Sequence, residues 1–214
     1  ACGLSPLLSE TAMAGLGLPT NGDSYAMAVA AIDEAVRNLI CVGADPRQIA
    51  ILDNFCWPKC DDPLQLGSLV RAAQGCYDAS LTYGVPFVSG KDSLSNQFTT
   101  DDGRVIAIPQ TLLITGLGIV PDVRRARTMD AKAPGNALLL VGSTESQLGG
   151  SQYLGLYADP TADPRISRVD LSLGTRCAAA VAALIERGLI ASAHDCSDGG
   201  LLIATRTDRK STRL

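Results

Sequence analysis

Two stretches in the first half of the chain carry apolar residues at helical spacing. Residues 24–42 consist of good helix formers, with Ile32 and Val36 on one face and a glycine directly after the stretch. Residues 63–83 carry leucines and alanines at similar spacing and end before a Gly-Val-Pro string. The pattern therefore predicts two helices, over 24–42 and 63–83.

Shorter β-branched runs between and after these helices predict strands. The run QIAILDNF at 48–55 suits a buried strand that ends in Asp53, and residues 86–88 begin another. The polar string TTDDGR at 99–104 is typical of a hairpin turn. Residues 105–120 are the most strand-like stretch of the chain and are interrupted by Pro109. The first 120 residues are thus expected to mix strands and helices.

A charged stretch at 121–136, with two prolines and a glycine, separates this part from the next apolar runs. Such a composition is typical of a domain junction. Beyond it, the pattern predicts a buried strand at 137–142, a helix at 176–189, a short strand at 190–193 and a loop at 194–200. The final string, RTDRKSTRL, has no apolar face, so we expect truncation or a non-native tail there.

Composition and charge narrow the class of protein. With 46% hydrophobic and 19% charged residues, the chain has material for a core and lacks the signature of disorder. Eighteen basic and 22 acidic residues give a net charge of -4, so we expect a small-molecule partner and neither nucleic acid nor a membrane. No apolar run approaches the roughly 18 residues of a membrane span, and we expect a cytoplasmic protein.

The seven cysteines are expected to be reduced thiols. An odd number in a chain of this length argues against an extracellular disulfide framework. Cys56 and Cys60 are close enough in sequence to form a metal pair. A zinc site needs about four ligands, however, and His194 is the single histidine. Small buried side chains are therefore the favoured interpretation of these cysteines.

Polar segments follow three of the predicted strands: Asp53-Asn54, residues 89–93 and residues 194–200. Backbone amides at strand ends are available to ligands. The glycine, lysine and serine of 89–93 could cradle a phosphate, although they lack P-loop spacing and an ordinary turn is equally compatible. The aspartates of 194–200 could hold Mg²⁺ or cap the following helix.

Glu34 and Asn38 lie four residues apart within the first predicted helix, so they share one face. If the two side chains were exposed, they would be part of an ordinary solvated helix face. Their neighbours on this face are small or apolar, which favours a metal-binding or hydrogen-bonding role.

Six strings in order resemble one enzyme family. They are AIDEAVRNLICVGADP, ILDNFCWP, DDPLQLGSLVRAAQGCYDA, PFVSGKDSLSNQ, LLITGLGIVPDVRR and HDCSDGGL. Together they resemble the second half of the synthetase subunit of phosphoribosylformylglycinamidine synthase, within the aminoimidazole ribonucleotide synthetase-like superfamily. The resemblance runs from about Asn21 to Leu202.

The resemblance implies an α+β fold with two α+β domains. Residues 1–121 would form the first domain, whose barrel-forming sheet pairs with another half and places nucleotide sites at the seam. Residues 122–136 would be the junction. Residues 137–214 would form an incomplete second α+β domain, truncated as its last helix begins.

The resemblance also implies roles for residues of the first domain. Asp53 and Gly90 match positions that contact ATP at the synthetase site. Ser93 matches a position near the ribonucleotide substrate. Lys91 stands where some members place an asparagine that binds Mg²⁺, so a phosphate contact is the expectation for this lysine.

A second, auxiliary nucleotide site is implied for the large single-chain members of the family. Glu34, Asn38 and Asp195 match its Mg²⁺ ligands, and Ser197 matches a nucleotide contact. The expected cofactors are therefore ATP or ADP and Mg²⁺.

The function implied is that of an ATP-dependent carbon–nitrogen ligase of de novo purine synthesis. ATP phosphorylates the formamide oxygen of formylglycinamide ribonucleotide, and ammonia from a glutaminase subunit or domain displaces the phosphate to give the amidine. The family's catalytic histidines and glycine-rich nucleotide loop belong to the first half, which this sequence does not include. We therefore expect a fragment that needs that half and is inactive alone.

Two alternatives stay open at this point. The chain could be a non-catalytic scaffold half whose bound nucleotide only stabilises the fold. It could also be another ATP-dependent enzyme of the superfamily, such as a relative of aminoimidazole ribonucleotide synthetase, selenophosphate synthetase or thiamine-phosphate kinase.

Overall fold

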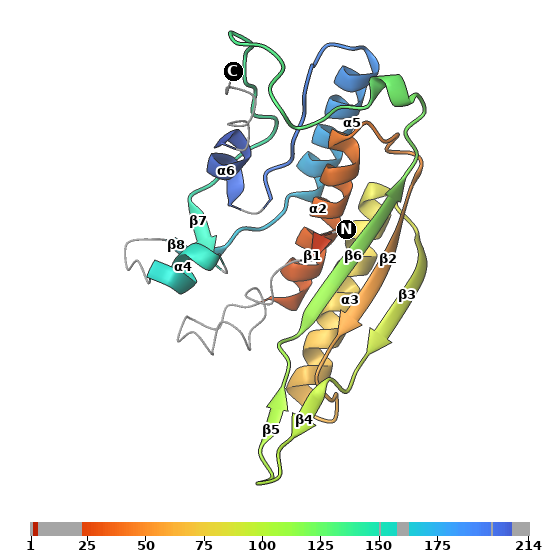
Figure 1. The fold of residues 1–214 in the computed structure, drawn as a ribbon. Helices are drawn as coiled ribbons and strands as arrows, with labels where there is room; N and C mark the ends of the chain where they lie inside the picture. Colours follow the sequence, from red (N-terminus) through yellow and green to blue (C-terminus); the bar gives the residue numbers. More distant parts are fainter. Residues whose placement is uncertain (1, 4–22, 150, 158–162, 198, 207–214) are drawn as a thin grey trace.

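The computed structural model describes residues 2–3, 23–149, 151–157, 163–197 and 199–206 (Figure 1). Its elements are β1 (Cys2–Gly3), α2 (Ser24–Cys41), β2 (Ile49–Cys56), α3 (Pro63–Tyr83), β3 (Phe87–Ser93), β4 (Gln97–Thr99), β5 (Val105–Ala107), β6 (Thr111–Gly118), the 3₁₀ helix η2 (Val123–Arg125), β7 (Gln147–Gly149), α4 (Gln152–Tyr157), β8 (Asp163–Ile166), α5 (Leu171–Glu186) and α6 (Gly200–Arg206). This mixture of helices and sheets confirms the predicted fold class.

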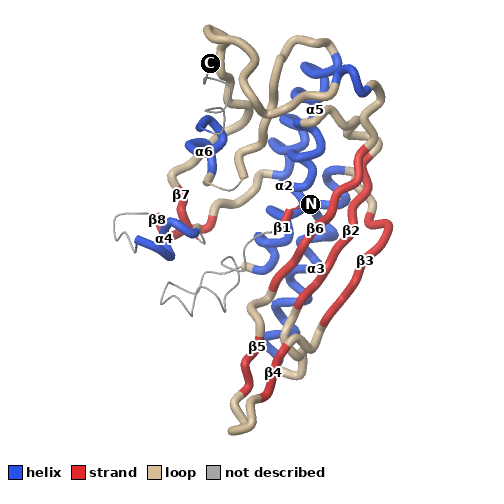
Figure 2. Tube along the Cα trace, viewed as in Figure 1, coloured by secondary structure: helices blue, strands red, loops and turns tan. Residues whose placement is uncertain are grey.

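One four-stranded sheet organises the first part of the chain, in the order β1-β6-β2-β3. Strands β2 and β3 are parallel and are joined by α3, whereas β6 runs antiparallel to β2. Figures 1 and 2 show α2 and α3 side by side along one face of this sheet, with α5 beside the end of α2. Strands β4 and β5 form a separate hairpin around the predicted TTDDGR turn.

Both long helices have defined ends. The side chain of Asp23 caps the start of α2 by accepting a hydrogen bond from the Tyr25 amide at 3.1 Å. In the same way, Asp62 caps α3, whose first residue is a proline. Helix α3 ends at Gly84, which has a φ of 68° and therefore adopts the left-handed conformation that favours glycine. These signals explain why both helices were predicted almost to the residue.

The hydrophobic core lies between the two helices and the sheet. Ile32 of α2, Ile51 of β2 and Ile114 of β6 are all fully buried. Ala178 of α5 belongs to the same buried cluster, and further residues of α5 pack against it. The second part of the chain therefore shares a core with the first through α5.

Two predictions for the polar segments were wrong in their secondary structure. Asp53-Asn54 lies within β2, and residues 89–93 lie within β3, whereas both were expected to follow strands. Their backbones pair in register from Asp53↔Gly90 to Cys56↔Ser93. Because β3 lies at the edge of the sheet, it tolerates polar and exposed side chains that a central strand would not.

Two apolar runs of the second part are not strands. Among the described residues, neither 137–142 nor 190–193 pairs with a strand. Leu138 is 79% exposed. An apolar run becomes a strand only when a neighbour satisfies its backbone groups, and the hydrophobic pattern does not identify that neighbour. Helix α5 also begins at Leu171, five residues before the predicted start at 176.

The charged segment after β6 is held against the end of α5. Arg125 Nη1 donates to the carbonyl of Glu186 at 2.6 Å, and Arg127 Nε donates to that of Ile190 at 2.8 Å.

The domain boundary at 122–136 stays a prediction. Within the described ranges, none of the helices combines the length and apolarity needed to cross a bilayer.

Candidate functional site

Asp53 and Gly90 lie directly opposite each other on β2 and β3. An added Cβ at Gly90 would lie 2.2 Å from Asp53 Oδ1 and 2.8 Å from Asp53 Cγ. The missing side chain at position 90 therefore makes room for the carboxyl group of Asp53. The resemblance implied that both residues contact ATP, and the strand register places them side by side, within the strands and not beyond their ends.

Asp53 faces the helices. Its neighbours on that face of β2, Ile51 and Phe55, are both buried. Burial raises the pKa of Cys76 in α3, and the charge of Asp53 raises it further. Burial raises the pKa of Asp53 itself, and Asp92 of β3 raises it further through its charge and a side-chain hydrogen bond. A backbone hydrogen bond partly opposes this shift. Two carboxyl groups thus meet beside Gly90, where a cation would relieve their repulsion.

Lys91 and Ser93 lie on the other face of the sheet. Successive side chains of a strand alternate between faces, and the strand register places Lys91 beside Asn54 and Ser93 beside Cys56. Lys91 Nζ donates a hydrogen bond to Ser93 Oγ. The structure therefore brings Asp53 to Gly90 and Lys91 to Ser93, but it separates the two pairs across β3.

Replacing Gly90 by alanine should force the Asp53 side chain to move. We expect a loss of about 1–3 kcal/mol in the free energy of unfolding, measured in urea. The control is the same substitution in an Asp53→Ala background, where the new methyl group meets no carboxyl group. A cost that is equal in both backgrounds would contradict this explanation.

The second group of predicted site residues lies between α2 and the loop at 194–197. Asp195 is buried, with 2% of its side chain exposed. Its Oδ2 lies 3.5 Å from Arg37 Nη1 of α2, and its Oδ1 lies 3.3 Å from His194 Nδ1. The loop thus reaches the helix that carries Glu34 and Asn38, as the resemblance implied.

Arg37 is the residue that the sequence analysis missed. Burial lowers its pKa, but the charges of Asp33, Asp195 and Glu34 outweigh this and raise it. Glu34 and Asp195 therefore act on the same guanidinium group, from α2 and from the loop. Glu34 and Asn38 are half-buried and each makes contacts of its own. The visible signal was the spacing of Asp33 and Arg37, one helical turn apart.

The donor set of this second group suits Mg²⁺, which takes oxygen ligands and commonly one or two carboxylates. Glu34, Asn38 and Asp195 supply two carboxylates and an amide oxygen. Among the described residues, no cluster of three or more histidines, cysteines, aspartates or glutamates could hold a metal. A cation here would therefore need Asn38 or ligand oxygens to complete its shell. The metal-binding role of this group stays a prediction, as does the nucleotide contact of Ser197.

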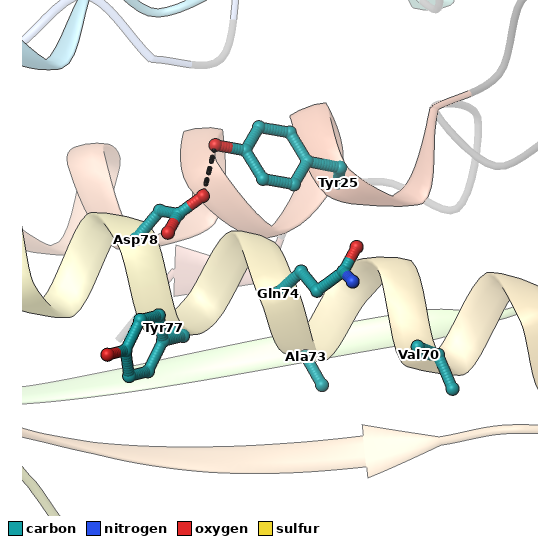
Figure 3. A pocket seen from close by; sticks show the side chains of 6 residues that line it. All are labelled: Tyr25, Val70, Ala73, Gln74, Tyr77 and Asp78. Atoms are coloured by element: carbon teal, nitrogen blue, oxygen red, sulfur yellow. Dashed lines mark hydrogen bonds between the residues drawn. The ribbon is translucent and has the colours of Figure 1, made fainter.

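A surface pocket between α2 and α3 contains none of the predicted site residues. Tyr25 Oη donates to Asp78 across it at 2.8 Å (Figure 3). Figure 3 also shows Val70, Ala73 and Tyr77 on one side of α3, with Asp78 pointing toward α2. The pocket is lined by Tyr25, Val70, Ala73, Gln74, Tyr77 and Asp78. This pocket is separate from both groups described above.

Comparison with known proteins identifies related sequences. The chain is 38% identical over 183 residues to phosphoribosylformylglycinamidine synthase subunit PurL of Gloeobacter violaceus, covering 85% of this chain and 23% of that protein. It is 40% identical over 191 residues to the same subunit of Deinococcus radiodurans, covering 85% and 24%. The chain therefore spans about a quarter of the length of these relatives, and the resemblance drawn from the six strings is confirmed.

Solved structures share the fold. Thermotoga maritima PurL complexed with FGAR matches with a TM-score of 0.63 at 20% identity, covering 88% of this chain and 29% of that one. Hydrogenase maturation protein HypE in complex with ATP matches with a TM-score of 0.55 at 24% identity, covering 83% and 48%.

Two family models match consecutive parts of the chain. "AIR synthase related protein, N-terminal domain" matches residues 7–120, and "AIR synthase related protein, C-terminal domain" matches residues 133–207. The first match alone covers more than half of the chain. The chain therefore belongs to the AIR synthase related protein family.

Proposed function

We propose that this chain is part of a phosphoribosylformylglycinamidine synthase and carries residues for nucleotide and substrate binding. The observation that carries the proposal is the match to PurL subunits at 38–40% identity over 85% of the chain. The six strings lie within the same stretch. The structural relatives complexed with ATP and with FGAR support ATP and a ribonucleotide as the ligands.

In the complete enzyme, the γ-phosphoryl group of ATP moves to the formamide oxygen of the substrate, and ADP leaves. Ammonia then forms a bond to the same carbon, and phosphate leaves. The nitrogen comes from a glutaminase subunit or domain, and the other half of the synthetase completes the site. Catalysis of this kind rests on positioning and on neutralising the phosphate charge.

The residues of β2 and β3 fit parts of this task. Gly90 makes room for the Asp53 carboxyl group, and the exposed backbone of this edge strand is accessible to a nucleotide. Lys91 supplies a cation for a phosphate, and Ser93, its hydrogen-bond partner, supplies a hydroxyl group for the substrate. Because these pairs lie on opposite faces of β3, a ligand or ligands that use all four must reach around this edge strand.

The residues of α2 and the 194–197 loop fit an auxiliary nucleotide site. Glu34, Asn38 and Asp195 would hold Mg²⁺, which would neutralise the phosphates of a bound nucleotide, and Ser197 would contact that nucleotide. The shared action of Glu34 and Asp195 on Arg37 supports their proximity. The same observation favours the second candidate function, a scaffold in which bound nucleotide stabilises the contact between α2 and this loop.

Mg²⁺ with ADP should raise the melting temperature of the purified chain. A ligand that binds only the native state adds roughly 2.7 kcal/mol of stability at a hundredfold excess over its dissociation constant. Glu34→Gln should remove most of that shift, whereas Glu145→Gln, an exposed glutamate outside the site, should leave it intact. The melting temperature is followed by circular dichroism. An unchanged value at millimolar Mg²⁺ and ADP would contradict the auxiliary site.

Activity separates the two candidate functions. The chain alone should form no amidine from ATP, ammonia and formylglycinamide ribonucleotide. The first half of the synthetase, expressed separately, is then added, and ADP release is measured with wild-type chain and with Lys91→Ala. Substrate-dependent release that the substitution removes supports a catalytic fragment. Release that is independent of Lys91 supports the scaffold.

A further inference from the structure

Arg37 joins two parts of the molecule through one guanidinium group. Its Nε donates to Asp33 Oδ2 at 2.7 Å within α2. Its Nη1 donates to the carbonyl oxygen of Cys196 at 3.1 Å and lies 3.5 Å from Asp195 Oδ2. These loop acceptors are 158 and 159 residues away in sequence. Arg37 is therefore a direct polar link between α2 and the 194–197 loop.

The Asp33 carboxylate, which accepts from this guanidinium group, is itself held in place by neighbouring helices. Asp33 is buried, with 9% of its side chain exposed, and its Oδ1 accepts a hydrogen bond from Tyr83 Oη of α3. An added Cβ at Gly174 of α5 would lie 2.1 Å from that Tyr83 oxygen, so α5 closes over the bond. Three helices therefore fix the carboxylate that orients Arg37.

Asp195 needs a cationic partner where it lies. A carboxylate that is almost fully buried is costly unless it is paired and hydrogen-bonded. Arg37 faces its Oδ2 and His194 faces its Oδ1. Because guanidinium is planar, permanently charged and has several donors, it can serve Asp33, Asp195 and the Cys196 carbonyl together. A lysine ammonium group could not reproduce this arrangement.

We propose that Arg37 is a positioning residue, which holds the Asp195-Cys196 segment against α2 and so presents Asp195 at a fixed place. The holding of the loop follows from contacts within this chain. The further consequence, that Arg37 orients a Mg²⁺ ligand, rests on the proposed function. The two parts are tested by different measurements.

The first test measures the rate at which iodoacetamide alkylates Cys196, which is partly buried in the loop. Trypsin releases Cys196 within residues 188–206 and Cys177 within residues 177–187, each as the single cysteine of its peptide. The ratio of the two alkylation rates, read by mass spectrometry, therefore reports on the loop and corrects for global unfolding. In Arg37→Met we expect this ratio to rise about tenfold, because the loop opens locally.

Two further variants complete this test. Arg37→Lys should give a smaller rise, since one ammonium group replaces only part of the contacts. Arg47→Met removes an exposed arginine that pairs with Asp45 and should leave the ratio unchanged. If Arg37→Met does not fold, both cysteines are alkylated faster, and the ratio measured for Arg37→Lys then decides the test. A ratio equal to wild type in the variant that folds would overturn the proposal.

The second test measures the affinity of the same variants for Mg²⁺·ADP by calorimetry. Arg37→Met and Arg37→Lys should bind more weakly, in the order of their alkylation ratios, while Arg47→Met should bind as wild type does. If wild type binds no Mg²⁺·ADP but its Cys196 depends on Arg37, the auxiliary site is wrong and the loop contact stands. If the loop opens without loss of affinity, Arg37 does not position Asp195 for the ligand.

Discussion

Replacing Trp57 by alanine should lower the free energy of unfolding by about 3–5 kcal/mol. The indole is fully buried, and its Nε1 donates to Ser68 Oγ of α3 at 3.0 Å. It also lies against Phe55, with ring centroids 5.4 Å apart. Truncation removes this contact area, leaves a cavity and deprives the serine of its donor.

The position of Trp57 makes this effect relevant to the candidate site. Its amide donates to the carbonyl of Ser93 at 2.8 Å, just after the end of β2. Urea unfolding should be followed by circular dichroism, because Trp57 is the single tryptophan. Trp57→Phe retains an aromatic ring and should cost clearly less. A Trp57→Ala variant within about 0.5 kcal/mol of wild type would contradict the packing described here.

The same substitution at two glycines of α3 should have opposite effects. Glycine within a helix costs roughly 0.5–1 kcal/mol relative to alanine. Gly67 has nothing within 4 Å of an added Cβ, so Gly67→Ala should stabilise the chain by about that amount. At Gly75, the added Cβ would lie 2.5 Å from the backbone oxygen of Tyr25 in α2 and 3.1 Å from Ala28 Cβ.

Gly75→Ala must therefore push α2 and α3 apart. We expect a net loss of about 1–3 kcal/mol, because overpacking at a backbone contact outweighs the gain in helix propensity. Urea midpoints of both variants and of wild type give the comparison. Changes of the same sign at both positions would show that the glycine at 75 is not required for the approach of the two helices.

The sequence predicted those elements whose determinants are local. The helix at 63–83 was found with those bounds, because its apolar spacing, its capping aspartate and Gly84 are all contained in the segment. The prediction of a strand at 137–142 was wrong because strand formation depends on a partner elsewhere in the chain. The polar residues 89–93 were assigned to a loop for the same reason, since only their pairing with β2 makes them a strand.

The predictions for the candidate site succeeded and failed for the same reason. The resemblance implied that Asp53 and Gly90 belong to one site, and their strand register places them side by side. Their separation from Lys91 and Ser93 was missed, because alternation between faces applies only once the segment is known to be a strand. Arg37 was missed because its decisive partner, Asp195, lies 158 residues further along the chain.

That long separation has a consequence for the order in which the chain assembles. Strands β2 and β3 and helices α2 and α3 occupy a nearly continuous segment, so their contacts form over short loops. The Arg37 contact closes a loop of 158 residues, and it forms only when α2 and the 194–197 loop have come together. Contacts of such separation form late, because the chain entropy lost on closing them is offset only by structure that already exists. The 194–197 loop should therefore be the last part of the described fold to dock during folding and the first to detach under mild denaturing conditions.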